Sequence, residues 1–336
     1  MSCALHSPHI AVIGAGIAGL SCATQLEALG MRVSVFDKSR GTGGRMSTRR
    51  GDDWQADHRA QYFTARDPLF IQELARWQQA GVADLWQADI AVLGEGSAHR
   101  NDGTTRRYVG VPRMSSPARW LADSLTVNPA ARVVELIDHH HRWQLRFDDA
   151  TDDREMLENT VFDAVVLAIP PAQAAALTRP HAAGITAVCE TSIMRPCWAV
   201  MLQFNTRVAL PYAAAFVNTG PLRWMARDSS KPGRPEGETW VLHATTDWSE
   251  QHLEDKADEV IQALTAALTT LGGPVPASAT AHRWLYAEPV PTAGTRAFVW
   301  AAARKLGLCG DWLHGGRVEG AWSSGRALAR SILAAD

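Results

Sequence analysis

The chain has 336 residues, of which 46% are hydrophobic and 20% charged, with a formal net charge of −2. This length allows two domains with a substantial core, and the balanced charge favours neither nucleic acid nor an anionic membrane as a partner. No apolar run reaches the length of a membrane span, no basic region precedes an apolar start, and the five cysteines form no CxxC pair, so we expect a cytoplasmic protein with reduced thiols.

The first predicted elements are typical of a dinucleotide-binding fold. The β-branched run His9–Ile13 predicts a strand, and a helical pattern follows it as far as Gly30. A second strand, Arg32–Phe36, ends at Asp37, about 20 residues beyond the glycine motif. The motif itself has the spacing GxGxxG and consists of Gly14, Gly16 and Gly19. With strand, helix and acid in this order, it predicts a dinucleotide site.

Each position of the motif has a physical role. Gly14 allows a tight turn, Gly16 lets the backbone approach a pyrophosphate, and Gly19 lets the helix pack closely on the strand. The N-terminus of the helix offers N–H groups and a partial positive charge to the phosphates. Asp37 can accept hydrogen bonds from the hydroxyls of the adenosine ribose.

The next loop favours FAD over NAD. Gly43 and Gly44 let the chain run against a ligand, and Arg45 can reach a phosphate or the flavin. A plain NAD dehydrogenase does not need such a loop. It is similar to the GG-x-R element of flavoproteins related to the amine oxidases, so we expect FAD as the cofactor.

Several segments in the middle of the chain carry clear patterns. Asp67–Gln79 predicts a helix, Ala130–Ile137 and Arg142–Phe147 predict a hairpin, and Phe162–Ala168 predicts a buried strand of a parallel sheet. The hairpin turn, Asp138–His141, holds three consecutive histidines. No partner ligands stand at zinc spacing, so we expect an exposed polar turn and no metal site.

From Pro196 onwards, strand-like runs alternate with turns rich in Gly, Pro and Ser, which predicts an antiparallel sheet. Ser229–Glu238 predicts a long polar loop, and Leu253–Leu271 predicts an amphipathic helix that covers the sheet. The expected strands are Cys197–Phe204, Ala213–Val217, Leu222–Arg227, Thr239–Thr245 and His282–Tyr286.

The last segments predict the far wall of the cofactor site. Leu306–Cys309 predicts a strand, and Asp311 just beyond it can contact the ribityl or pyrophosphate part of FAD. Arg317–Gly325 opens the last predicted helix, Arg326–Leu333. A helix N-terminus at the pyrimidine edge of a flavin stabilises the negative charge of the reduced form.

Together these motifs resemble the renalase family, in its bacterial branch, along most of the chain. The resemblance implies FAD bound without covalent attachment, and oxidation of the 2- and 6-dihydro isomers of NAD(P)H to NAD(P)+ with O2 reduced to H2O2. One departure is Arg59, where the family usually has glycine. Beside the glycine motifs, the resemblance rests on AQYFTARD (60–67), YVGVP (108–112), VVLAIP (165–170), CWAVM (197–201), WVLHA (240–244), HRWLYA (282–287) and GDW…GGRVEGAW (310–322).

The resemblance also implies which residues contact FAD, among them Val133 as a backbone contact to adenine. Including the glycine motif, the expected contacts are Gly14, Gly16, Ile17, Ala18, Gly19, Asp37, Lys38, Gly44, Arg45, Met46, Ala60, Gln61, Tyr62, Val133, Asp311, Val318, Glu319 and Ala321.

We therefore expect an α/β protein with a Rossmann-like, two-dinucleotide-binding FAD domain that is discontinuous in sequence, formed by residues 1–75, 108–172 and 303–336. Residues 76–107 and 173–302 are expected to form a substrate domain with a mainly antiparallel sheet covered by helices. The oligomeric state stays open.

Hydride transfer from a dihydronicotinamide needs little acid–base help, because the product is a stable aromatic cation. The protein mainly has to stack the ring and exclude water. The expected substrate-facing residues are Tyr62, Trp198, Trp224, His243 and Trp284. His243 could bind a carboxamide or equally be a satisfied core histidine, and for any single tryptophan core packing is the alternative.

Two other functions are open. An amine oxidase often places a lysine near flavin N5, but none of the four lysines, Lys38, Lys231, Lys256 and Lys305, is persuasive from its sequence context. The second alternative is a flavoprotein that binds FAD without turnover. Arg223, Arg227 and Arg296 could meet substrate phosphates, although we expect each to be solvated.

Overall fold

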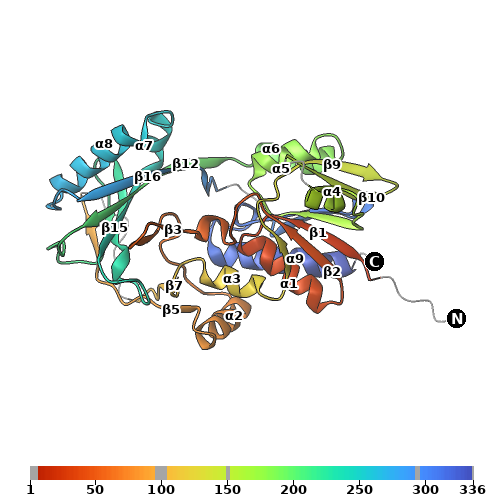
Figure 1. Cartoon of the computed structure of the whole chain (residues 1–336), viewed down its shortest axis with the longest axis horizontal. Helices are drawn as coiled ribbons and strands as arrows, with labels where there is room; N and C mark the ends of the chain where they lie inside the picture. Colours follow the sequence, from red (N-terminus) through yellow and green to blue (C-terminus); the bar gives the residue numbers. More distant parts are fainter. Residues whose placement is uncertain (1–6, 95–103, 149–151, 292–295, 335–336) are drawn as a thin grey trace. The chain divides into compact units, whose positions relative to one another are not determined.

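The computed structural model describes residues 7–94, 104–148, 152–291 and 296–334 and forms two compact units (Figure 1). Unit 1 comprises Met1–Gly44, Ala118–Met194 and Pro289–Asp336, and unit 2 comprises Arg45–Pro117 and Arg195–Glu288. One sheet in unit 1 is mostly parallel and one in unit 2 is mostly antiparallel, which confirms the expected α/β class.

Unit 1 is built on a six-stranded sheet. Its strands are β1 (His9–Ile13), β2 (Arg32–Phe36), β8 (Thr126–Asn128), β11 (Ala164–Leu167), β17 (Phe298–Ala301) and β18 (Leu306–Cys309). They lie in the order β17–β18–β11–β1–β2–β8, all parallel except the edge strand β17. Every residue of β1 and β11 is buried, as expected for central strands covered on both faces.

Helices and a hairpin complete unit 1. Helix α1 packs along α9, α5 packs against α6, and the β9–β10 hairpin lies beside α4 (Figure 1). Their bounds are α1 (Ile17–Ala28), α3 (Ser116–Ala122), β9 (Val133–His139), β10 (Arg142–Phe147), α4 (Asp152–Glu158), α5 (Pro171–Thr178), α6 (Ala183–Thr191) and α9 (Val318–Ala334). Short 3-10 turns stand at Ala302–Arg304 and Asp311–Leu313.

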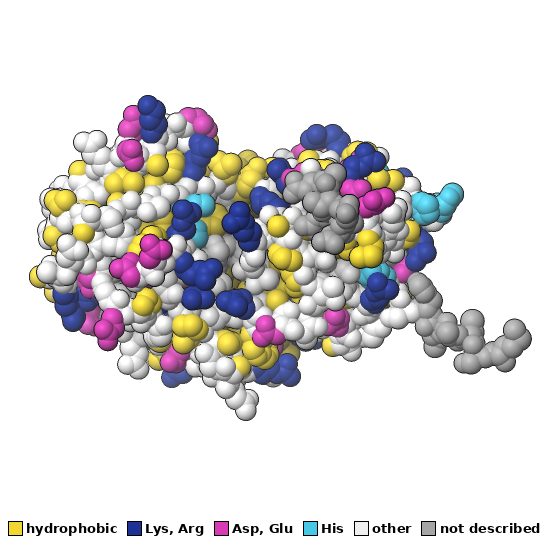
Figure 2. All heavy atoms as spheres, viewed as in Figure 1, with side chains coloured by type: hydrophobic (Ala, Val, Ile, Leu, Met, Phe, Trp, Pro, Cys, Tyr) yellow, Lys and Arg dark blue, Asp and Glu magenta, His cyan; other side chains and the backbone are white. Residues whose placement is uncertain are grey.

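The histidine turn of the hairpin is exposed. His139, His140 and His141 all face solvent, and Figure 2 shows histidine side chains at the surface at the end of this hairpin. Among the described residues, no group of three or more His, Cys, Asp or Glu side chains could hold a metal ion.

Unit 2 is built on a second six-stranded sheet, in the order β16–β12–β15–β14–β13–β6, with β6 parallel to β13. Its elements are β3 (Thr48–Arg50), β4 (Gln55–Asp57), α2 (Pro68–Gln79), β5 (Ala83–Leu85), β6 (Ile90–Leu93), β7 (Tyr108–Gly110), β12 (Met194–Phe204), β13 (Ala214–Val217), β14 (Leu222–Arg227), β15 (Glu238–Ala244), α7 (Thr246–Gln251), α8 (Ala257–Thr270) and β16 (Ser278–Pro289).

Helix α8 covers one face of the unit 2 sheet. Val260, Leu264 and Leu268 of this helix are fully buried and pack in one core with strand residues such as Val200 and Leu242. The other face of the sheet carries different side chains, because successive residues of a strand point to opposite faces. That second face is where most of the expected substrate residues lie.

Two predicted helices differ from the structure. The helix expected from Leu253 begins at Ala257, because the Glu259 side chain accepts a hydrogen bond from the Lys256 N–H at 3.0 Å and caps it there. The last helix begins at Val318 rather than at Arg326, and Gly320 and Gly325 lie inside it. A Cβ atom on Gly325 would collide with the Ala18 carbonyl of α1, so this glycine serves close helix packing and does not mark a helix end.

The compact units divide the chain at positions that differ from the expected domains. Residues 45–75 and 108–117, expected with the FAD domain, pack within unit 2, and residues 173–194 pack within unit 1. Residues 289–302 also lie in unit 1, because β17 pairs with β18. In the part of the chain that the structure describes, no helix is both long and apolar enough to cross a bilayer.

The glycine at the α1–α9 contact gives a stability test. We expect Gly325→Ala to lower the free energy of unfolding by roughly 1–3 kcal/mol, because the added methyl meets backbone atoms that cannot move aside. Gly184→Ala in α6 is the matched control, since nothing lies within 4 Å of its added Cβ, and it should raise stability by up to about 1 kcal/mol. Urea unfolding measures the free energy of unfolding of both variants. Equal changes in the two variants would contradict the packing role of Gly325.

Candidate active site

The glycine loop of unit 1 has the geometry of a phosphate cradle. Gly14 has a φ of +110°, a backbone conformation that favours glycine, and a Cβ on Gly19 would collide with the Gly14 carbonyl. Gly16 differs from both, because nothing lies within 4 Å of a Cβ added there. Two glycines are thus required by the protein's own packing, and the third leaves open space at the N-terminus of α1.

This open space suits an anionic ligand. Gly16 is the N-cap of α1, and no side chain caps the helix there. The first turn therefore presents its backbone N–H groups and the positive end of the helix dipole to a ligand. Asp37 accepts hydrogen bonds from Ala15 N–H at 2.6 Å and from Ser39 N–H at 2.7 Å. The acid therefore braces the glycine loop, while its expected contact to a ribose stays a prediction.

The far end of the chain supports the same cradle. The hydroxyl of Ser21 in α1 donates to the Trp322 carbonyl in α9 at 2.7 Å, and Ser324 Oγ accepts from Gly310 N–H at 2.8 Å. Three expected FAD contacts, Val318, Glu319 and Ala321, lie in the first turn of α9. The expected contact Asp311 is buried and precedes this helix. The expected contact Lys38 is exposed and follows β2.

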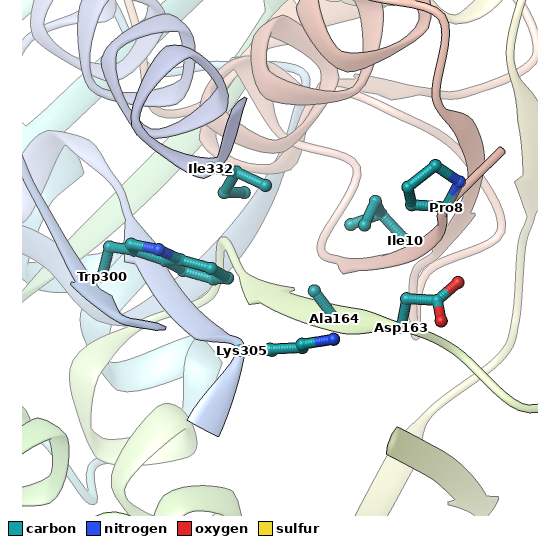
Figure 3. A pocket seen from close by; sticks show the side chains of 7 residues that line it. All are labelled: Pro8, Ile10, Asp163, Ala164, Trp300, Lys305 and Ile332. Carbon is teal, nitrogen blue, oxygen red and sulfur yellow. The ribbon is translucent and has the colours of Figure 1, made fainter. Parts of the chain in front are cut away.

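A cavity in unit 1 lies apart from this cradle. About 270 Å³ in volume, it lies at the amino-terminal ends of β1, β11 and β18, with Trp300 on one side and Pro8 and Ile10 on the other (Figure 3). Dinucleotides bind at the carboxyl ends of such strands, where Gly14 and Asp311 follow β1 and β18. The cradle, and not this cavity, fits FAD.

In unit 2, a buried ion cluster fixes the segment 57–62, which carries the expected FAD contacts Ala60, Gln61 and Tyr62. Lys231 Nζ lies 2.6 Å from Asp228 and 3.1 Å from Asp57, and Arg234 Nη2 lies 2.6 Å from Asp57. Burial would raise the pKa of Asp57, but the Lys231 and Arg234 charges hold it at about 2. Two cations and two anions, all buried, balance each other here.

This cluster adds to one expectation. Lys231 and Arg234 belong to the segment 229–238, which was expected to be a long polar loop, yet both side chains are at most 1% exposed. Lys231 Nζ also lies 3.4 Å from Gln61 Oε1. Composition could not reveal this, because the partner Asp57 stands 174 residues away in the sequence.

The carbonyl of His58 holds two expected substrate residues. His243 Nε2 lies 3.2 Å from it, and Trp284 Nε1 donates to it at 3.1 Å. A carbonyl only accepts hydrogen bonds, so the proton of neutral His243 is on Nε2 and its Nδ1 is an acceptor. The rings of His58 and Trp284 also lie 5.0 Å apart.

Four aromatic side chains meet on the sheet face opposite α8. Trp224 stands opposite His243 in the β14–β15 register and opposite Phe216 in the β13–β14 register, and the Tyr62 ring lies 5.7 Å from Trp224. We call Tyr62, Phe216, Trp224 and His243 the aromatic face. Trp224 is 4% exposed, and its Nε1 has no hydrogen-bond partner among the described residues.

Trp198 lies elsewhere. It belongs to the core between the sheet and α8, together with Val200 and Leu202, and its Nε1 donates to the His252 carbonyl at 2.9 Å. Its neighbour Ala199 pairs with His243, so Trp198 points to the opposite face of the sheet. The structure therefore brings together Tyr62, Trp224, His243 and Trp284, but not Trp198.

The histidines around the aromatic face are neutral at pH 7. Burial lowers the pKa of His58 to about 3, with the nearby His282 and Arg49 adding to the effect. Burial also lowers the pKa of His243 well below its usual value, and the Arg59 and Arg223 charges act in the same direction. Neutral rings and indoles thus surround a site that contains no charged histidine.

Two of the arginines expected to be solvated are not. Arg227 is 8% exposed and pairs with Glu238 at 2.9 Å, and Arg223 is only partly exposed and pairs with Glu288 at 2.7 Å. Arg296 is exposed, as expected. The sequence carries no signal for the pairing of Arg223, because Glu288 stands 65 residues away and the strand irregularity appears only in the paired structure.

Gly16 separates ligand binding from folding. We expect Gly16→Ala to weaken FAD binding about 10- to 100-fold, because its methyl fills the space that a pyrophosphate needs, while the apoprotein keeps its melting temperature. Gly19→Ala should lower that temperature as well, since its methyl collides with Gly14. Quenching of FAD fluorescence and thermal melts measure the two effects, and unchanged FAD affinity in Gly16→Ala would refute the cradle.

Buried His58 makes stability depend on pH. The unfolded chain binds a proton below about pH 6.5 and the folded chain does not until about pH 3, so stability falls with falling pH in that window. We expect the free energy of unfolding to drop by roughly 2 kcal/mol from this group between pH 7.5 and pH 5. In His58→Gln the drop should shrink by this amount, and in the exposed-turn variant His139→Gln it should not change.

Comparison with known protein families gives two matches. Residues 12–76 match the NAD(P)-binding Rossmann-like domain, and residues 83–333 match the flavin containing amine oxidoreductase family. Among curated proteins, the L-amino acid oxidases Cdc18 of Crotalus durissus cumanensis and bordonein-L of Crotalus durissus terrificus are each 45% identical over 49 residues. That is 15% of this chain, and it spans only 10% of each relative's length.

Solved structures resemble the whole chain. A putative protoporphyrinogen oxidase from Exiguobacterium sp. 255-15 superposes with a TM-score of 0.78 at 13% identity, covering 98% of this chain and 99% of that one. Cyclohexylamine oxidase from Brevibacterium oxydans IH-35A gives 0.73 at 12% identity, covering 97% and 98%. Identities this low show the fold alone.

The cradle geometry fits a dinucleotide, and the flavoprotein family model matches residues 83–333, well over half of the sequence. The chain therefore belongs to the flavin-containing amine oxidoreductase family, and its cofactor is FAD.

Proposed function

We propose that this flavin-dependent oxidoreductase oxidises the 2- and 6-dihydro isomers of NAD(P)H to NAD(P)+, with O2 as the acceptor. The nicotinamide ring loses a hydride, and this hydride, one proton and O2 give H2O2. FAD, when bound, supplies a two-electron acceptor at N5 that O2 can reoxidise. The renalase-like motifs of the sequence support this substrate class.

The observation that carries the proposal is the aromatic face with its neutral histidine. A dihydronicotinamide that loses a hydride becomes an aromatic cation, so no residue has to take up a proton from it. Tyr62 and Trp224 offer flat surfaces for stacking, with ring centroids 5.7 Å apart. His243 is kept neutral by burial, so it does not repel the cation that forms.

The hydrogen-bonding groups of the face complement a carboxamide. His243 Nδ1 is an acceptor, because Nε2 carries the proton toward His58. Trp224 Nε1 is a donor without a partner among the described residues. A carboxamide offers a carbonyl acceptor and an NH2 group with two N–H donors, so one acceptor and one donor on the same sheet face can orient a nicotinamide ring.

Amine oxidation is the second candidate, because the chain belongs to the amine oxidoreductase family. Its usual lysine near N5 has one buried candidate here, Lys231. The Lys231 ammonium, however, is shared between Asp57 and Asp228, which leaves it little capacity to hold a catalytic water. This observation favours the dihydronicotinamide substrate.

A single experiment separates the candidates. Oxidised holoprotein is mixed anaerobically with 2- and 6-dihydroNAD(P), with β-NADH and with several amines, and the flavin absorbance is followed. We expect rapid bleaching by the dihydro isomers alone. Bleaching by amines alone would establish an amine oxidase instead, and no bleaching by any compound would favour a protein that binds FAD without turnover.

Variants then connect the activity to the aromatic face. We expect His243→Leu to slow flavin reduction by the dihydro isomers about tenfold or more, since it removes the Nδ1 acceptor that we propose for the carboxamide. Trp198→Phe is the control, because Trp198 lies on the opposite side of the same sheet, and its reduction rate should stay within about twofold of the wild type.

A further inference from the structure

Beside the aromatic face lies a second ion cluster, built on Arg59 and Arg223. Arg223 Nη1 lies 2.7 Å from both oxygens of Glu288, and Thr246 donates its hydroxyl to the same carboxylate at 2.5 Å. Arg59 Nη2 lies 3.7 Å from Glu288 and donates to the Ala287 carbonyl at 2.8 Å. We call Arg59 and Arg223 the arginine pair.

The arginine pair has less negative charge around it than the Lys231 cluster. Two guanidinium groups share one carboxylate, Glu288, whereas Lys231 and Arg234 share two, Asp57 and Asp228. Among the described residues, their titratable neighbours Cys197 and His243 add no anion, since burial raises the pKa of the Cys197 thiol and lowers that of His243. Arg45 lies beside the pair and donates to the same Ala287 carbonyl at 3.3 Å.

The pair is also reachable. The side chains of Arg59 and Arg223 are 13% and 31% exposed, and that of Glu288 is 30% exposed, whereas those of the Lys231 cluster are at most 1% exposed. A surplus cation that is partly open to solvent can exchange its partner for a ligand, and guanidinium groups match the planar oxygens of carboxylate and phosphate.

A β-bulge places Arg223 beside Trp224. Leu222 pairs with Ala244 and Trp224 pairs with His243, so Arg223 is an extra residue in the ladder. Leu222 and Met225 both belong to the core under α8. The two residues between them are thus left for the other face, where the Trp224 N–H has no hydrogen-bond partner within the described part of the chain.

We propose that Arg59 and Arg223 bind the oxyanion, a phosphate or a carboxylate, of a ligand whose planar ring lies on the aromatic face. Glu288 is the resting counter-ion that the ligand's anionic group displaces. This specificity rests on the proposed function and sharpens it, because it selects an anionic nucleotide and disfavours a cationic amine.

Binding of matched ligands tests the pair without turnover. Isothermal titration of the FAD-loaded protein compares nicotinate with nicotinamide for the carboxylate, and nicotinamide mononucleotide with its riboside for the phosphate. We expect the anionic member of at least one couple to bind more tightly, and Arg223→Met and Arg59→Met to weaken it about 10- to 100-fold. The uncharged or dephosphorylated member should change by less than about twofold in these variants.

Three further variants sharpen the result. Glu288→Gln should tighten binding of the anion, because it removes the competing carboxylate. Arg223→Lys keeps the charge but not the planar guanidinium group, so it should bind the anion more tightly than Arg223→Met and less tightly than the wild type, which guards against a variant that fails to fold. Arg179→Met, which breaks an exposed pair with Glu190 in unit 1, should change nothing.

The outcomes are distinct from those of the oxidase assay. Equal affinity within both couples, or anion affinity that both methionine variants leave intact, would overturn the arginine pair even if the dihydro isomers bleach the flavin. Conversely, selective anion binding that depends on the pair would stand even if those isomers are not oxidised.

Discussion

The course of segment 57–62 depends on one buried interaction, the salt bridges of Asp57 with Lys231 and Arg234. Thr48 Oγ1 and the Met114 N–H also donate to this carboxylate, at 2.7 and 3.2 Å, so four groups converge on one side chain. Removing a partner from such a pair leaves a charge buried without compensation, at a cost of about 3–5 kcal/mol. His58, Arg59, Gln61 and Tyr62 follow within five residues, so the site inherits the rigidity of the cluster.

The first local elements of the fold could be predicted almost to the residue. β1, the glycine turn and β2 were found because turn chemistry and strand patterns are encoded in consecutive residues. The start of α9 was missed because Gly320 and Gly325 look like helix ends in the sequence, whereas the structure needs Gly320 close to the His314 carbonyl and Gly325 close to the Ala18 carbonyl of α1. A pattern of consecutive residues does not show which glycines are needed for close packing against another segment.

The candidate site could be predicted only in part, because local sequence patterns do not show which distant segments meet. Aromatic residues in strand patterns pointed to Trp224 and His243, but the sequence could not assign Trp198 to the other face, because both faces of this sheet are apolar. Lys231 has one ion partner nearby in the sequence, Asp228, but its other partner, Asp57, is 174 residues away, and the partner of Arg223 is 65 residues away. The bulge at Arg223 appears only once the strands are paired.

The contact between α1 and α9 has a consequence for how the protein is made. Ser21 and Trp322, which it joins, are 301 residues apart, and β18, the neighbour of β11, also belongs to the last part of the chain. Loop closure over such a distance is slow, and sheets with non-local pairings fold late. During synthesis, α1 therefore cannot form its contact with α9 until nearly the entire polypeptide has been made, so the cofactor fold is completed late.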